Sequence, residues 1–135
     1  MIIRAAIALA CAAAASCANP GAPDPRPAVG IWGGTGIRLD ITASDAAIEY
    51  DCAHGTIDQP IVADRAGRFS ARGTHVREHG GPIRIDEPPD RHPATYEGEL
   101  SGNSLRLAVT LVDTHQTAGT FSATLNGAAR LVKCL

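Results

Sequence analysis

The sequence predicts an all-β domain, a small antiparallel up-and-down barrel of about seven to nine strands. Apolar and polar residues alternate with a period of two along most of the chain beyond residue 28, which is typical of strands that bury one face. Gly, Asn, Asp and Ser interrupt these runs at short intervals, as turns do. Beyond the first residues, no window carries the 3.6-residue apolar stripe of an amphipathic helix. A meander of this kind must close or cover its edge strands, and a barrel does so.

The first 17 residues have the pattern of an export signal. Arg4 precedes an Ala/Ile/Leu run that ends at small residues. The run is shorter than the roughly 18 apolar residues of a spanning helix, so it predicts export and no membrane span of its own. Residues 14–17, Ala-Ala-Ser-Cys, resemble the lipobox of bacterial lipoproteins, and this resemblance implies lipid attachment at Cys17. Ordinary cleavage near Ala18 is the alternative.

Residues 18–28 are predicted to be a tether between the lipid and a domain of residues 29–135. The tether contains four prolines, which disfavour both helix and sheet and favour an extended spacer. Several acyl chains on one cysteine would anchor the protein stably. We therefore expect an exported protein of the cell envelope, held at a bacterial membrane and facing the periplasm or the cell surface.

The composition limits the possible partners. The chain has 12 basic and 14 acidic residues, a formal net charge of −2. Nucleic-acid binding needs a basic face, so this mild acidity argues against a nucleic-acid partner. The length beyond the tether suits one small domain.

Four alternating runs predict strands at residues 37–42, 48–52, 105–111 and 120–125. Turns are predicted at residues 43–45, 54–55, 65–67, 101–103 and 126–127. The side chains expected to fill the barrel are Trp32, Ile37, Leu39, Ile41, Ile48, Tyr50, Phe69, Val76, Tyr96, Leu100, Leu105, Leu107, Val109, Leu111, Phe121, Leu125 and Val132. This set is about enough to fill a small barrel and leaves little room for a large ligand.

The two cysteines of the domain, Cys52 and Cys134, are predicted to form a disulfide, because paired cysteines of an exported domain are normally oxidised. Closing a loop of about 80 residues would stabilise the fold by on the order of 4 kcal/mol. By strand parity, Cys52 is expected on the inward face with Tyr50, and Cys134 on a face with Val132. The bond would then tie the last strand to an early one and help close the barrel.

A catalytic role for Cys52 is the alternative, because His54 follows it by two residues. A thiol in a disulfide is no nucleophile, and Gly55 predicts that His54 lies in a turn with Asp51 and Asp58 nearby. No catalytic residue is therefore predicted.

Residues 75–79 spell His-x-x-Glu-His, the order of the inverzincin metalloprotease motif. That mechanism requires a helix, whereas the flanking residues predict a strand and a loop. On a strand, residues four apart lie about 13 Å from each other, too far to share a zinc ion. No metal or cofactor is predicted. A chance metal site remains open if the following loop brought together His75, His79 or His92.

Residues 80–93 form the longest predicted irregular segment, and long ordered loops often carry binding. The hydrophobic Ile83 and Ile85 could form a short strand or fold over a barrel mouth. A rigid lid without a ligand is the alternative. The candidate binding residues are Ile83, Asp86, Glu87, Asp90, Arg91 and His92.

Residues 30–32, Gly-Ile-Trp, resemble the first strand of calycin-type barrels, the group that includes lipocalins, avidins and small bacterial protease-inhibitor barrels. This resemblance implies a calycin-like architecture in which a basic residue of the last strand, Arg130 or Lys133, packs across Trp32. The run Trp32-Gly33-Gly34, the stretch Asp-Cys-Ala-His-Gly-Thr-Ile, the run Gly-Gly-Pro and the final Lys-Cys-Leu also resemble a family of small exported bacterial proteins. That likeness implies no activity.

The predicted function is that of a non-enzymatic cell-envelope lipoprotein, a disulfide-closed β-barrel that acts as a binding or structural module. Its partner would be a protein, a glycan or a small ligand. One alternative is a periplasmic protease inhibitor of the small β-barrel type, in which the residues after Cys17 enter a protease cleft. The other is an enzyme that uses His54, or His75 and His79, with acidic neighbours.

Overall fold

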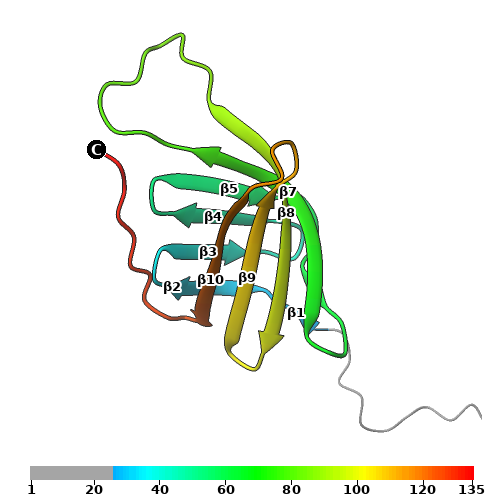
Figure 1. The fold of residues 1–135 in the computed structure, drawn as a ribbon. Coiled ribbons are helices and arrows are strands. Elements are labelled where there is room, and N and C mark those ends of the chain that lie inside the picture. Colours follow the sequence, from blue (N-terminus) through cyan, green and yellow to red (C-terminus); the bar gives the residue numbers. More distant parts are fainter. Residues whose placement is uncertain (1–25) are drawn as a thin grey trace, which may run out of the picture.

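The computed structural model describes residues 26–135, which form an all-β structure, as predicted. Within these residues, eight antiparallel strands close into a small up-and-down barrel in the order β10-β2-β3-β4-β5-β7-β8-β9 (Figure 1). The barrel strands are β2 (Gly30–Gly34), β3 (Ile37–Ile41), β4 (Ala46–Tyr50), β5 (Ala53–Ile57), β7 (Arg68–Arg77), β8 (Asp90–Ser101), β9 (Ser104–Leu111) and β10 (Thr117–Leu125). In residues 26–135, no helix has the length and apolar character needed to cross a bilayer.

One end of the barrel is covered by a short two-stranded sheet of β1 (Arg26–Pro27) and β6 (Val62–Ala63). Ala28 is buried there, and its N–H donates to the carbonyl of Ile61 at 3.1 Å. The Trp32 indole N–H donates to the carbonyl of Ala28 at 3.0 Å. The last three residues of the predicted tether therefore pack against the domain. Cys17 and the rest of the tether lie outside the described residues.

The other end, which we call the disulfide end, carries the β2–β3, β4–β5 and β9–β10 turns and the β7–β8 loop, residues 78–89. Figure 1 shows this loop and the C-terminus together at this end. The segment after β10, residues 126–135, forms no strand of the barrel, and we call it the tail. Val132, predicted in the core, is 71% exposed because it lies on this tail.

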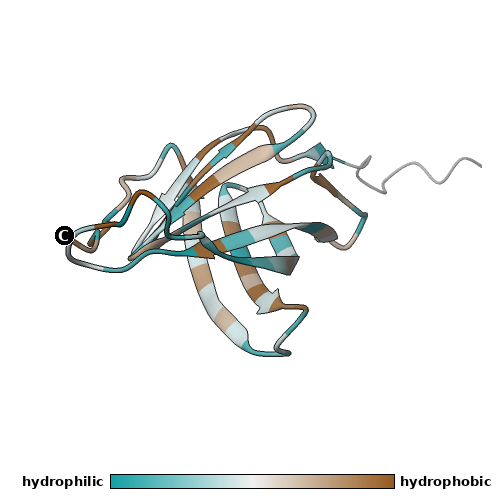
Figure 2. Cartoon of the chain, turned by 90° about the horizontal axis from the view of Figure 1, so that it is seen from above, coloured by the Kyte–Doolittle hydropathy of each residue, from teal (hydrophilic) through white to brown (hydrophobic). Residues whose placement is uncertain are grey.

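The other predicted core side chains pack inside the barrel or against its core, except Val76, which is buried but lies outside the core cluster. Figure 2 shows the hydrophobic and hydrophilic bands alternating along the strands. Three of these side chains, Leu100, Phe121 and Leu125, are only partly buried. The prediction omitted Ile57 and Ile61, which are also buried.

The turn predicted at residues 54–55 is wrong. Residues 53–57 form β5, and the chain reverses three residues earlier than predicted, at residues 51–52, where Tyr50 pairs with Ala53 across a two-residue hairpin turn. Cys52 occupies this turn with a φ of 50°, in the left-handed region. Its position is therefore set by the turn and not by the inward face of a strand. The last four residues of the segment predicted to be irregular, 90–93, form the start of β8.

Strand pairing, not the disulfide, closes the barrel. β10 pairs with β2 through Thr124 opposite Gly33 and Leu125 opposite Trp32. The predicted disulfide is present between Cys52 and Cys134, with their Cα atoms 4.9 Å apart. It joins the tail to the β4–β5 turn, so the expected link between an early strand and the last strand is wrong.

Candidate functional site

The tail runs along the rim of the disulfide end and is fixed there at successive points. The Gly36 N–H donates to the carbonyl of Arg130 at 2.7 Å, and the Val132 N–H donates to the Asp51 carboxylate at 2.6 Å. The disulfide follows two residues later, and the Gly81 N–H donates to the Leu135 carbonyl at 2.9 Å. The tail therefore contacts the β2–β3 turn, the β4–β5 turn and the β7–β8 loop in that order.

Lys133 adds an ionic attachment between the tail and the barrel. Its amine donates to Glu49 at 2.9 Å and Glu78 at 2.8 Å, and to the carbonyls of Tyr50 and Ala53, both at 3.0 Å. Burial alone would lower the pKa of Lys133, but the hydrogen bonds with the two carboxylates outweigh burial and raise it. The hydrogen bond from Lys133 is also the main cause that lowers the pKa of Glu78. Lys133 thus lies at the β4–β5 turn. The calycin resemblance had instead implied that Arg130 or Lys133 packs across Trp32.

Replacing Lys133 with methionine, which keeps the apolar stem, should lower the free energy of unfolding by about 1–2 kcal/mol. The estimate is modest because solvent reaches the amine and both carboxylates. The pKa of Glu78 should rise in this variant, which a carboxyl NMR titration would measure. Because the pKa of Glu78 is lowered in the folded state, its ionised carboxylate stabilises the fold at pH values above the ordinary pKa of 4.5. This stabilisation is lost as the pH falls through the pKa that Glu78 has in the folded protein.

The matched control is Arg130→Gln, on the same tail, where the side chain is exposed. It should change stability by less than about 0.5 kcal/mol. An unchanged Glu78 titration in Lys133→Met would contradict the ionic attachment.

The β7–β8 loop is closed by its own ion pair. His79 Nε2 lies 2.6 Å from Glu87 Oε1, and hydrogen bonds with the Gly80 carbonyl and with Glu87 raise the pKa of His79. Ile83 is 73% exposed and Ile85 is fully exposed, so neither folds over the barrel mouth. The loop projects from the disulfide end beside the tail (Figure 1).

The predicted loop residues divide between this loop and β8. Ile83, Asp86 and Glu87 are in the loop, whereas Asp90, Arg91 and His92 are in β8. The six residues therefore come from two adjoining elements and not from one loop. Asp90 and His92 belong to the rim of the barrel mouth instead.

His92 joins two parts of that rim. Its Nδ1 lies 2.8 Å from Asp113 in the β9–β10 turn, and its Nε2 lies 2.8 Å from Asp90 at the base of the β7–β8 loop. Only an imidazolium can donate from both nitrogens. The hydrogen bond to Asp113 is the main cause that raises the pKa of His92, and the same bond lowers the pKa of Asp113.

The barrel mouth at the disulfide end is a depression of about 330 Å³. It lies between the β2–β3 and β4–β5 turns, which the tail contacts, and strands β7 and β10. Tyr50 and His75 line it and are only 2% and 6% exposed. Their ring centroids are 5.1 Å apart. The residues that line the depression are Gly36, Tyr50, Asp51, Cys52, Ala53, His75, Arg77, Ala118 and Phe121.

Among residues 26–135, two buried polar atoms of the residues that line this depression have no hydrogen-bond partner, His75 Nδ1 and the Tyr50 hydroxyl. Tyr96 lies near Tyr50 and helps to raise its pKa, but the two hydroxyls do not meet hydrogen-bond geometry. The Tyr96 hydroxyl donates instead to the Thr74 carbonyl at 2.5 Å. Burial raises the pKa of Tyr50 far above its usual range and raises that of Tyr96 to about 12. Both phenols are therefore neutral.

His75 is also kept neutral. Burial is the main cause that lowers its pKa, and the positive charges of Arg77, His92 and His54 lower it further, against a smaller opposing effect of Asp90. The mouth therefore offers a neutral imidazole and a neutral phenol, both buried, beside the Arg77 guanidinium. These hydrogen-bonding groups lie in a recess of mixed polar and apolar lining.

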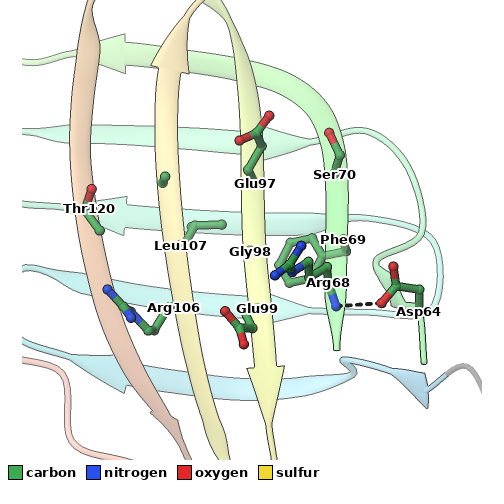
Figure 3. A pocket seen from close by; sticks show the side chains of 11 residues that line it. Asp64, Arg68, Phe69, Ser70, Glu97, Gly98, Glu99, Arg106, Leu107 and Thr120 are labelled. Carbon is green, nitrogen blue, oxygen red and sulfur yellow. Dashed lines mark hydrogen bonds between the residues drawn. The ribbon is translucent and has the colours of Figure 1, made fainter. Parts of the chain in front are cut away.

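A larger depression, about 560 Å³, lies on the outer face of β7–β10. Figure 3 shows Arg68, Glu97, Glu99 and Arg106 around it, on neighbouring strands. These four side chains are exposed to solvent. Water can satisfy them, so the outer depression carries no sign of a missing ligand comparable to that at the mouth.

The sequence reasoning missed this site, although it named two of its residues for other reasons. Tyr50 was expected only as core, and His75 only as part of a metal motif. The signal was parity: His75 follows Phe69 and Ala71 on the inward face of β7, where a polar side chain is unusual. Arg77 continues that same face to the rim.

The structure excludes the proposed thiol chemistry, because Cys52 is in the disulfide. His54 lies on β5, with its Nδ1 3.5 Å from Glu78, and not in a turn beside Asp51 and Asp58 as predicted. His75 is on strand β7, as its flanking residues predicted, so the helix that an inverzincin site needs is absent there. Among residues 26–135, no three His, Cys, Asp or Glu side chains are grouped to hold a metal ion.

Comparisons with protein-family models, with curated proteins and with solved structures found no match to this chain.

Proposed function

We propose that this protein is a non-enzymatic cell-envelope lipoprotein whose disulfide-stabilised barrel binds a small ligand at its mouth. The observation that carries the proposal is the pair of buried, unpartnered polar atoms, His75 Nδ1 and the Tyr50 hydroxyl. A small molecule in the depression would supply the partners that the protein itself does not.

His75 Nδ1 and the Tyr50 hydroxyl lower the stability of the fold while they lack partners. A buried polar group without a partner costs about 1–3 kcal/mol. Phenylalanine at either position would fill similar space without that cost, and Tyr50 already packs against Phe121 with ring centroids 5.0 Å apart. Sequence choices that lower stability without a structural gain are typical of functional sites.

The envelope location is supported by the sequence. The signal pattern and the lipobox-like residues 14–17 favour attachment through Cys17, and the oxidised Cys52–Cys134 pair suits an exported protein. The described chain begins at the opposite end of the barrel from the mouth. An anchor preceding Arg26 would therefore leave the mouth accessible to ligand.

Two substitutions test the proposal through the sign of their effects. Tyr50→Phe and His75→Phe should each raise the free energy of unfolding, by about 1–3 kcal/mol, and should remove any small molecule that copurifies with the protein from its native envelope. Thermal unfolding and native mass spectrometry would measure the two effects.

Tyr96→Phe is the matched control, because that buried hydroxyl has a partner in the Thr74 carbonyl. It should lower stability by about 1 kcal/mol. If Tyr50→Phe and His75→Phe destabilised the fold as Tyr96→Phe does, both groups would be structural and the proposed site would be wrong.

A further inference from the structure

We propose that the ligand of the barrel mouth is a small organic carboxylate with a short apolar or aromatic body, bound by Arg77 with His75 and Tyr50 as hydrogen-bonding partners. This inference rests on the proposed function and adds the chemical class of the ligand. Three features of the mouth carry it: the free capacity of Arg77, the charges around His75 and the apolar walls.

Arg77 lines the mouth with an exposed guanidinium, so solvent and not a carboxylate of the described residues satisfies most of its donors. Its Nη2 donates to Gln116 at 3.3 Å, and among the described residues no carboxylate lies within ion-pair distance of it. A guanidinium carries five N–H donors in a planar fork that matches the two oxygens of a carboxylate. The geometry therefore leaves an anion-binding group at the edge of a recess that already contains two unpartnered polar atoms.

The charges that face His75 favour an anion over a cation. Arg77 and His92 contribute positive charge from β7 and β8, and His54 contributes from β5 when it is protonated, against Asp90 from the base of β8. Asp51 also lines the mouth, but one of its oxygens already accepts the Val132 N–H at 2.6 Å. A carboxylate could accept from the Tyr50 hydroxyl and from a His75 N–H without placing a second cation against these groups.

The walls limit the rest of the ligand. The rings of Tyr50 and Phe121 and the methyl groups of Ala53 and Ala118 supply apolar contacts. The volume of about 330 Å³ is at the small end of ligand sites, so it suits a single ring or a short chain. Larger lipids would exceed this volume.

The test uses three probes of the same shape and different charge, phenylacetate, phenylacetamide and phenethylamine, with the full exported protein. Isothermal titration calorimetry gives the affinities, and NMR of the His75 ring reports on occupancy of the mouth. We expect phenylacetate to bind at least about tenfold more tightly than the amide, and the amine to show no binding. Saturating phenylacetate should shift the His75 ring signals.

Arg77→Gln should weaken phenylacetate binding about tenfold or more. Arg72→Gln, on the outward face of the same strand, should leave it unchanged. Equal affinities for the acid and the amide, or equal binding by wild type and Arg77→Gln, would overturn the carboxylate assignment. If the amide or amine bound and shifted His75, the mouth would still be a ligand site of another class. If none of the probes bound and no copurifying molecule were found, both proposals would fail.

Discussion

Replacing Cys134 with serine is expected to lower the free energy of unfolding by about 2–5 kcal/mol. The disulfide joins residues 82 positions apart, so it removes a large amount of conformational freedom from the unfolded chain. It also fixes the tail, which forms no strand of the barrel and has little burial of its own. Chemical denaturation followed by the fluorescence of Trp32, the single tryptophan, would measure the loss.

The partner cysteine of the disulfide provides the control variants. Cys52→Ser and the double variant should lose the same stability as Cys134→Ser, since each removes the same bond. The wild-type protein should show neither Cys52 nor Cys134 as a free thiol in peptide mass mapping. A reactive thiol at Cys52 together with normal stability would refute the structural role and reopen the question of thiol chemistry.

Loss of the disulfide should also affect the mouth. Cys52 lines the depression, and the tail holds Asp51 through the N–H of Val132. A released tail would leave the Asp51 carboxylate free to reorient toward Arg77, which lines the same depression. Weaker phenylacetate binding in Cys134→Ser would therefore accompany the lower stability.

The fold was largely predictable because it depends on a local pattern. Alternation such as that of Ile37, Leu39 and Ile41 reports directly which face of a strand is buried, and turn residues mark where strands end. The prediction failed at β5, because glycine is a common turn residue and Gly55 predicts a turn there. In the barrel, Gly55 lies within a strand where a side chain would collide with the Tyr96 hydroxyl and the Thr74 carbonyl.

The candidate site was much less predictable, because it depends on contacts that no local pattern reports. Parity placed Tyr50 in the core correctly, but it could not reveal that its hydroxyl lacks a partner while the Tyr96 hydroxyl has one. The tail posed the same problem. Val132 and Cys134 alternate as a strand would, yet at these residues the tail is held by bonds to two side chains of the β4–β5 turn, Asp51 and Cys52.

Replacing Gly34 with alanine is expected to lower the free energy of unfolding by about 3 kcal/mol, at the upper end of the usual cost of overpacking. A Cβ at Gly34 would collide with the carbonyl of Ser122 in β10, and a Cβ at Gly33 would collide with that of Gly127. These are backbone atoms, so no rotamer change relieves the overlap. Elsewhere in a chain, Gly→Ala at a compatible position is stabilising by about 0.4–1 kcal/mol, so the sign of the effect is diagnostic.

The cost should be large because the damage falls on the weakest part of the barrel. β10 and β2 share only the pairs Thr124 with Gly33 and Leu125 with Trp32, whereas β7 and β8 pair along ten positions. Separating β10 from β2 would expose two strand edges, which can pair with other molecules. Gly34→Ala should therefore form oligomers that light scattering detects. The control is Ala47→Val, which adds volume on the exposed face of β4. It should stay monodisperse like the wild type, and its stability should be within about 0.5 kcal/mol of the wild-type value. Wild-type stability and an unchanged oligomeric state in Gly34→Ala would show that the pairing of β10 with β2 does not depend on close backbone contact.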